Sequence, residues 1–317
     1  MKKIEKVKNR TMRIWKKIYL YITNPAFRFN INTNRGKYDN LSDEEFLKLK
    51  FKTVFGREID FRNPKSYNEK LQWIKLYDRK PIYSNMVDKY EAKKFVASQI
   101  GDEYVIPTLG VWERFEDIDF EKLPEKFVLK CTHDSGGLII CRDKSALDIK
   151  QAQIKIEKCL KHNYFLSGRE WPYKNVKPRI IAEEYMEDIA TGELRDYKFY
   201  TFNGKAKYVM INSERGIGTT KADYFDKDFN WLDFTWGYPN ANTRIDKPRN
   251  FEKMLELSEC LAKDTYELRV DFYECNGQIF FGELTFFDGG GFTKFQPESW
   301  DFVFGSQLNL PIETIDK

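Results

Sequence analysis

Arg269-Val270-Asp271-Phe272-Tyr273 leads through Asn276-Gly277-Gln278 into Ile279-Phe280-Phe281-Gly282-Glu283-Leu284-Thr285. Both runs are rich in aromatic and β-branched residues and are joined by a turn-forming segment, which predicts two neighbouring strands. Apolar residues alternate with polar ones, so we expect one face of this pair to be buried. The other face holds four polar side chains: Arg269, Asp271, Glu283 and Thr285.

The register of this hairpin decides whether its two carboxylates meet. A three-residue loop at 276–278 pairs Asp271 with Glu283 and Arg269 with Thr285, whereas a two-residue Asn-Gly turn places the carboxylates on opposite faces. The apolar pattern favours the three-residue loop. Two facing carboxylates repel each other, and oxygen ligands at this spacing suit Mg²⁺ bound together with substrate phosphates. The alternative is an exposed strand face with a salt bridge to Arg269.

The composition is that of a globular protein. The chain has 317 residues, 41% of them apolar and 32% charged, which is enough for two domains or for one domain with subdomains. A net charge of +4 is too small to indicate a nucleic-acid partner. Five cysteines without a C-x-x-C pair indicate reduced thiols, and two histidines argue against a zinc site. Without a membrane-spanning apolar run or a secretory signal, we expect a cytoplasmic protein.

The pattern of residues divides the chain into four segments. Residues 1–40 form a basic amphipathic segment, residues 41–103 a helical N-terminal subdomain, residues 104–180 a central subdomain with a glycine loop, and residues 181–317 a C-terminal subdomain with the hairpin. Helices and strands alternate irregularly, with several adjacent strand pairs. This favours an α+β fold with antiparallel sheets over a doubly wound parallel sheet.

Residues 1–24 have two interpretations. Five apolar residues fall at helical spacing among lysines and arginines: Met12, Trp15, Ile18, Tyr19 and Ile22. Such a helix is typical of a surface that contacts anionic lipid, which would place the protein at the inner face of the membrane. The alternative is a helix packed on the body of the protein.

Helix starts are marked further along the chain. Ser42 is an expected N-cap, and Ser66 with Glu69 has the spacing of a capping box. Another helix is expected from about Asp88 to Gln99, ending before Gly101.

A lysine and a glycine pair lie between two expected strands. Phe127–Lys130 is followed by Cys131-Thr132-His133-Asp134-Ser135-Gly136-Gly137 and then by a second strand. Glycines let backbone N–H groups approach phosphate oxygens, and Lys130 adds a positive charge. The pattern is neither a Walker A loop nor a dinucleotide fingerprint, and the alternative is an ordinary glycine hairpin. His133 is either a base or phosphate ligand, or a residue that hydrogen-bonds within the loop.

The order of these pieces resembles the ATP-grasp enzymes. Within that superfamily, three stretches are similar to the TupA-like branch, which is associated with teichuronopeptide and bacterial surface polysaccharide synthesis: Asn63–Trp73, Cys131–His133 and Phe281–Phe286. The resemblance covers roughly residues 40–300. It implies an ATP-grasp fold in which two antiparallel-sheet subdomains hold the nucleotide, preceded by a helical N-terminal region.

The resemblance also implies roles for individual residues. Lys89 and Lys130 would contact the nucleotide, with a phosphate-covering loop of Ser135, Gly136 and Gly137. The adenine would be lined by Glu183, Tyr185 and Met186. Asp196, followed by Lys198, lies where a ribose-binding acid is expected. Mg²⁺ would be held by Asp271 and Glu283, with Thr285 where many of these enzymes have an asparagine ligand, so that the number of metal ions is open. Arg269 would steady the acyl-phosphate or tetrahedral intermediate.

The implied activity is that of an ATP-dependent carboxylate-amine ligase that uses ATP and Mg²⁺. Its partners would be an amino acid or amine and a carboxylate-bearing sugar or peptide of a surface polysaccharide. Gly289-Gly290-Gly291 follows the metal strand, where substrate would approach; the alternative is a flexible turn. Three other functions stay open: an ATP-grasp kinase, a non-catalytic nucleotide-binding protein, and a glycosyltransferase that uses Asp226-Lys227-Asp228 as a metal-binding motif.

Overall fold

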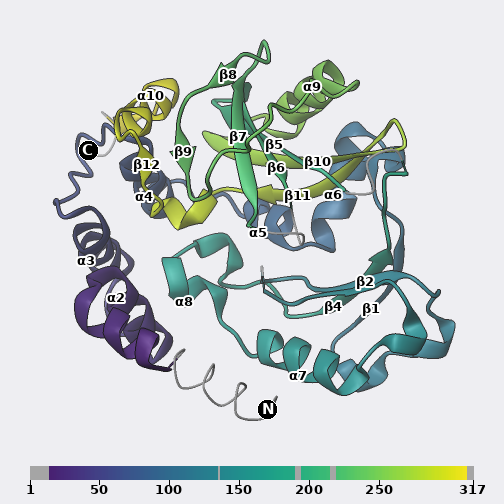
Figure 1. Cartoon of the computed structure of the whole chain (residues 1–317). Coiled ribbons are helices and arrows are strands. Elements are labelled where there is room, and N and C mark those ends of the chain that lie inside the picture. The colour runs from purple at the N-terminus through teal and green to yellow at the C-terminus, as the bar shows by residue number, and fades with distance from the viewer. Residues whose placement is uncertain (1–13, 135, 190–193, 215–218, 313–317) are drawn as a thin grey trace.

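Two antiparallel sheets form the frame of the molecule. The computed structural model describes residues 14–134, 136–189, 194–214 and 219–312. The smaller sheet has the strand order β1-β4-β2-β3, and the larger one the order β11-β10-β5-β6-β7-β8. Figure 1 shows the smaller sheet below the larger one, with α7 on its outer side.

The strands of the smaller sheet are β1 (Thr108–Trp112), β2 (Phe127–Cys131), β3 (Leu138–Cys141) and β4 (Ile180–Glu184). Those of the larger sheet are β5 (Asp196–Phe202), β6 (Lys205–Ser213), β7 (Lys221–Asp226), β8 (Trp231–Leu232), β10 (Glu267–Cys275) and β11 (Gln278–Thr285). A two-stranded pair is formed by β9 (Thr235–Trp236) and β12 (Phe295–Gln296). Because β4 pairs with β1 and β2, the boundary expected between residues 180 and 181 is misplaced: the smaller sheet continues to Glu184.

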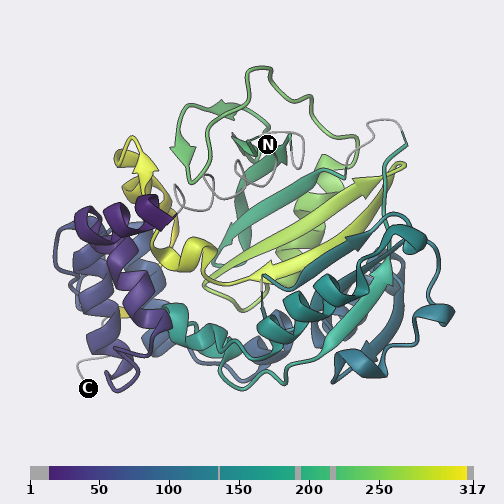
Figure 2. The ribbon, with the colours of Figure 1, turned by 60° about the horizontal axis from the view of Figure 1, so that its bottom comes forward.

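Helices gather at one end of the molecule and behind the sheets. The N-terminal ones are α2 (Pro25–Asn34), α3 (Asp43–Phe55), α4 (Tyr67–Tyr77), α5 (Ile82–Val87) and α6 (Glu91–Ile100). The later ones are α7 (Ile149–Leu160), α8 (Tyr164–Gly168), α9 (Phe251–Leu261) and α10 (Ser299–Gln307). Figure 2 shows α2, α3 and α4, in purple and dark blue, together at one end of the molecule, whereas α5 and α6 lie beside β11 (Figure 1). The expected N-cap at Ser42 and the capping box of Ser66 with Glu69 are both confirmed.

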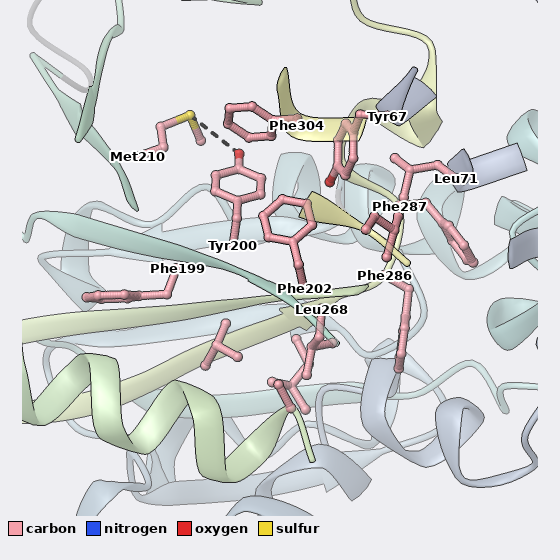
Figure 3. Close-up of a cluster of buried hydrophobic side chains, with 14 of the residues drawn as sticks. Tyr67, Leu71, Phe199, Tyr200, Phe202, Met210, Leu268, Phe286, Phe287 and Phe304 are labelled. Atoms are coloured by element: carbon pink, nitrogen blue, oxygen red, sulfur yellow. Dashed lines mark hydrogen bonds between the residues drawn. The ribbon is translucent and has the colours of Figure 1, made fainter. Parts of the chain in front are cut away.

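Each sheet has its own apolar core, as expected for two subdomains. The smaller core is closed by α7 against Phe127 and Leu129. The larger core joins α4, the larger sheet and α10 through aromatic side chains. In Figure 3 Tyr67 of α4 lies among Phe202 and Phe304, and its hydroxyl donates to Glu267 Oε1 at 2.8 Å. A buried tyrosine with a satisfied hydroxyl fixes α4 against the base of β10.

The hairpin of β10 and β11 has the predicted pairing, reached by a different route. Asp271 lies opposite Glu283 and Arg269 opposite Thr285. The expected three-residue loop is wrong, because Cys275 pairs with Gln278 across a two-residue turn whose residues both have positive φ. A β-bulge shifts the register between Asp271 and Phe272, leaving Gly282 as the extra residue and returning both carboxylates to one face.

Gly282→Val is expected to lower the free energy of unfolding by about 1–3 kcal/mol, the usual cost of overpacking. An added Cβ would lie 3.1 Å from the carbonyl oxygen of Asp271 and 3.2 Å from the ring of Tyr273. Urea unfolding measures the change, with Gln278→Thr at the exposed start of β11 as the control. An unchanged midpoint for Gly282→Val would show that the bulge accepts a side chain.

Residues 14–23 form a helix whose apolar side chains are exposed. Trp15 is 66% exposed, Tyr19 65% and Ile22 68%. Another side of the same helix contacts the body of the protein, because the Tyr21 hydroxyl donates to Asn32 Oδ1 of α2 at 3.0 Å. Both interpretations of this segment therefore stay open, and Met12 lies outside the described residues. Within the described ranges, no helix combines the length and the apolar character needed to cross a bilayer.

Candidate nucleotide and metal site

Arg269 ties together the two carboxylates of the hairpin. Its Nε and Nη2 donate to Asp271 at 2.7 and 2.8 Å, and Nη2 also donates to Glu283 Oε1 at 2.7 Å. The Arg269 side chain is only 8% exposed, so its charge is largely removed from water. Both carboxylates and Arg269 thus share one face of the hairpin, as the alternation of residues predicts.

A third carboxylate completes the surroundings of Arg269. Asp288 follows β11, and its Oδ1 forms an ion pair with Arg269 Nη1 at 2.8 Å. Its Oδ2 accepts a hydrogen bond from the hydroxyl of Tyr200. Sequence analysis did not identify Asp288 as a site residue. The available signal was its place directly before three glycines, a short distance beyond the predicted metal strand.

Lys198 enters the same cluster from β5. It is paired with Asp271, and its Nζ lies 2.8 Å from Asp196 Oδ2. Burial lowers the pKa of Lys198, but Asp196 and Asp271 outweigh that effect and the net pKa is raised. Two cations, Lys198 and Arg269, are therefore paired with four carboxylates, which leaves this side of the site with two excess negative charges. The four are Asp196, Asp271, Glu283 and Asp288.

The smaller sheet contributes positive charge. Glu183 of β4 forms two ion pairs: its Oε2 lies 2.5 Å from Lys130 Nζ, and its Oε1 lies 2.6 Å from Lys93 Nζ. Burial raises the pKa of Glu183, but the charges of Lys130 and Lys93 lower it by more. The net pKa is therefore below the ordinary value, and the carboxylate is ionised. The side chain predicted to line the adenine is thus engaged by two lysines. Lys93, which sequence analysis missed, lies one helical turn after Lys89.

The position of Lys89 differs from the expected one. We placed Asp88 and Lys89 on a helix, but they lie in the connection between α5 and α6. There the Lys89 backbone N–H donates to the carbonyl of Thr132 at 3.0 Å, and Nζ donates to the carbonyl of Asp134 at 2.9 Å. Lys89 is therefore attached to the glycine loop of the smaller sheet.

The two groups of charges lie close together. Burial raises the pKa of Glu283, but Lys89, Arg269, Lys198 and Lys130 overcome it and hold the pKa at about 2. Two of these four cations belong to the positive group. Burial is also the largest influence on Asp271, whose pKa is raised to about 6 despite Arg269 and Lys198. A negative side and a positive side thus face a common region.

The glycine loop is described in part. Ser135 lies outside the described residues. Gly136 is exposed, whereas Gly137 is buried, and an added Cβ there would lie 2.5 Å from Cys131 Sγ. Close packing therefore explains Gly137, and Gly136 is the glycine open to a ligand. His133 is 4% exposed and its Nε2 lies 3.1 Å from the carbonyl oxygen of Cys159. This contact favours the interpretation of His133 as a residue that bonds within the loop.

The connection after β4 carries the rest of the predicted adenine site. Tyr185 accepts a hydrogen bond from Arg142 Nε at 3.0 Å and has Lys126 over its ring at 5.5 Å. Met186 is half-buried. Since the Tyr185 side chain is engaged by these cations, the backbone of this connection is the part left for an adenine edge.

The residues of the hairpin fit a divalent ion held with phosphates. The described residues contain no group of three or more histidine, cysteine or acidic side chains arranged to bind a metal by themselves. Mg²⁺ usually takes one or two carboxylates and completes its shell with water and substrate phosphates. Asp271 and Glu283 supply that pair, with Thr285 on the same face. The excess of two negative charges matches a divalent ion.

Two antiparallel sheets that bring groups of opposite charge together are the arrangement that the resemblance to ATP-grasp enzymes predicts. The chain belongs to the TupA-like ATPgrasp family, whose model matches residues 69–309. No curated protein matches the chain.

Several solved structures are similar to it. D-alanine–D-alanine ligase from Bacillus anthracis complexed with ATP is 17% identical over 64% of this chain and 55% of that one, with a TM-score of 0.40. The Helicobacter pylori D-alanine–D-alanine ligase is 12% identical over 77% and 70%, with a TM-score of 0.40. Phosphoribosylamine–glycine ligase from Thermotoga maritima is 14% identical over 64% and 48%, with a TM-score of 0.39. The chain spans about half the length of the first and third of these structures.

Proposed function

We propose that the protein is an ATP-dependent carboxylate-amine ligase that binds ATP with Mg²⁺. The observation that carries the proposal is the charge arrangement around Glu283: carboxylates on the larger sheet, Lys130 on the smaller sheet, and Lys89 bonded to the loop that follows Lys130. A triphosphate needs positive groups along its oxygens, and its metal ion needs anionic ligands. Family membership supports the same function.

The reaction proposed has two steps. A substrate carboxylate oxygen attacks the γ-phosphorus of ATP, the bond to the β-phosphate oxygen breaks, and acyl-phosphate and ADP form. The amine nitrogen then attacks the acyl carbon, the bond to the phosphate oxygen breaks, and amide, inorganic phosphate and a proton are released. Mg²⁺, when bound, would neutralise phosphate charge. Lys130 and Lys89 would hold phosphate oxygens, and Arg269 would stabilise negative charge that develops at the acyl group.

The acceptor class rests on the resemblance to the TupA-like branch. We propose that the carboxylate belongs to a uronic acid or peptide of a bacterial surface polysaccharide and that the second substrate is an amino acid or amine. Fold-level analogy alone supports this part of the proposal. The exposed apolar residues of helix 14–23, beside Lys16 and Lys17, support contact with anionic lipid at the inner face of the membrane.

The glycosyltransferase alternative has less support. Asp226 accepts hydrogen bonds from the backbone N–H of Asp228 and Asn230, and Asp228 forms an exposed pair with Lys227. These contacts are those of an Asp-initiated turn after β7.

Trapping with hydroxylamine separates a ligase from a kinase. With ATP, Mg²⁺ and uronic-acid glycans or peptides as carboxylate donors, we expect ADP release together with a hydroxamate product, detected by mass spectrometry. An ATP-grasp kinase would release ADP and give a phosphorylated hydroxyl instead. A phosphate ester with no hydroxamate would overturn the proposal. The reaction without ATP is the control.

A further inference from the structure

A cavity of about 360 Å³ lies beside the glycine turn that follows the metal strand. Its walls come from α2, α3, α8 and the turn η6 (Asp288–Gly291), at Gly289 and Gly290. Two residues with charged side chains line it, Lys50 of α3 and Glu170. The motifs found in the sequence include neither of them.

Glu170 is a buried carboxylate whose oxygens accept no hydrogen bond in the part of the chain that the structure describes, although two lysines lie near it. It is 5% exposed, and burial raises its pKa against the opposing charges of Lys75 and Lys50. An added Cβ on Gly168 or Gly290 would lie 2.9 or 3.3 Å from Glu170 Oε1, so the carboxylate lies against these two glycines of the cavity wall. The two lysines offset part of the cost of burying this charge, but a buried carboxylate that accepts no hydrogen bond is still costly, which indicates a donor group that binds there.

Lys50 supplies the opposite charge with spare donors. It is 9% exposed, donates to the carbonyl of Ser167 at 2.8 Å, and lies 4.4 Å from the ring centroid of Phe292. An ammonium group has three donors, and one of them makes this hydrogen bond. The neighbouring Lys75 differs, because its ammonium is fully buried and donates to Gln72, Gly168 and Gly290. Lys75 therefore supports the wall, and Lys50 is the lysine available to a ligand.

The cavity adjoins the proposed reaction centre. Gly289 directly follows Asp288, which holds Arg269. On the opposite wall, Tyr164 packs its ring 4.7 Å from that of Tyr173. Burial, followed by the charges of Tyr164, Glu170 and Glu283, raises the pKa of Tyr173.

We infer that this cavity binds the amine substrate as a zwitterionic amino acid, with its ammonium group on Glu170 and its carboxylate on Lys50. The inference rests on the proposed ligase function. A simple carboxylate would be repelled by Glu170, and a metal ion would find a single carboxylate ligand beside two lysines. A zwitterion satisfies both charges of the wall at once.

Binding of amino acids to the full-length chain tests the inference. Each of the twenty common amino acids, and the decarboxylated amine of each one that binds, is titrated by calorimetry at neutral pH. Glu170→Gln is expected to weaken the amino acid and the amine about 10- to 100-fold, the range of a lost charge-assisted hydrogen bond. Lys50→Met is expected to weaken the amino acid by a similar factor and to leave the amine unchanged.

Matched controls are available on the surface. Lys52→Met on the same helix and Glu116→Gln change exposed residues and should leave both affinities unchanged. If Glu170→Gln fails to fold, Asn34→Trp at the exposed part of the cavity wall replaces it and should block the same binding. Equal affinities in wild type and folded variants, or no amino acid bound by the wild type, would overturn the inference.

A nucleotide measurement distinguishes the two proposals. Glu170→Gln and Lys50→Met should bind Mg-ADP within about twofold of the wild type, because neither side chain contacts the residues assigned to the nucleotide. Amino-acid binding without ATP turnover on any substrate would remove the ligase function and leave the cavity as a binding site. ATP turnover with an amine substrate, unaffected by both variants, would do the reverse.

Discussion

Replacing Arg269 by methionine is expected to lower the free energy of unfolding by about 3–5 kcal/mol and to abolish ADP release. Arg269 is 8% exposed and is paired with Asp271, Glu283 and Asp288. Methionine keeps the apolar volume but leaves three carboxylates facing one another, and removing one partner of a buried pair costs about this much. Urea unfolding and ADP release measure the two effects.

Mg²⁺ should reverse part of the loss of stability. A divalent ion that binds the folded state stabilises it, and the variant has more uncompensated negative charge in the site than the wild type. We therefore expect millimolar MgCl₂ to raise the unfolding midpoint more in Arg269→Met than in the wild type, with an equal concentration of NaCl having a smaller effect. Arg114→Met, on an exposed arginine with two acidic partners, is the control. If both arginine variants unfold alike, Arg269 is not the residue that holds the site together.

The hairpin shows what residue alternation can and cannot predict. Alternating apolar residues placed Asp271 opposite Glu283, and the structure has that pairing. The same facial pattern arises from a three-residue loop or from a two-residue turn with a bulge. Glycine at position 282 and the Asn-Gly pair were the local signals for the second solution. Which side chains share a face was predictable, because burial of the apolar residues decides it. Whether a three-residue loop or a bulge produces that arrangement depended on one unpaired residue, Gly282.

Local signals were predicted well because their partners are near in the chain. The capping boxes at Ser42 and Ser66 bond to residues three positions away. Asp288 and Lys93 were missed because their partners are far away in the chain. Asp288 is paired with Arg269 across the turn that follows β11, and Lys93 is paired with Glu183 from another subdomain. A surface lysine and a site lysine have the same local pattern on a helix, so the sequence gives no reason to prefer one.

The resemblance to a known family supplied what local patterns did not. Lys89 and Lys130 come from different elements, and only the order of motifs predicted that both belong to the site. Both lysines lower the pKa of Glu283. Glu170 and Lys50 belong to none of these motifs, since their relation arises from the packing of the N-terminal helices on α8.

Glu283→Gln is expected to reduce Mg-ATP-dependent ADP release by about 10²–10⁴-fold while the protein stays folded. Metal stabilisation of transferring phosphate is worth several kcal/mol, and each 1.36 kcal/mol is a tenfold change in rate. Glutamine keeps the size of the side chain and can accept a hydrogen bond from Arg269, but it removes the charge that a metal ion requires. The Glu283 side chain is 37% exposed, and Arg269 keeps Asp271 and Asp288, so we expect less than about 1 kcal/mol of lost stability.

Asp228→Asn is the matched control, because it also removes one carboxylate and tests the transferase alternative. Asp228 is exposed and paired with Lys227, whereas Asp226 bonds to the backbone of its turn and would confound stability with activity. A ligase should lose ADP release in Glu283→Gln and retain it in Asp228→Asn. A transferase that uses the Asp-x-Asp motif should give the reverse, with sugar transfer lost only in Asp228→Asn. Since Glu283 is paired with Arg269 and its pKa is also lowered by Lys89 and Lys130, full turnover in Glu283→Gln would mean that any ATP chemistry of this chain takes place elsewhere.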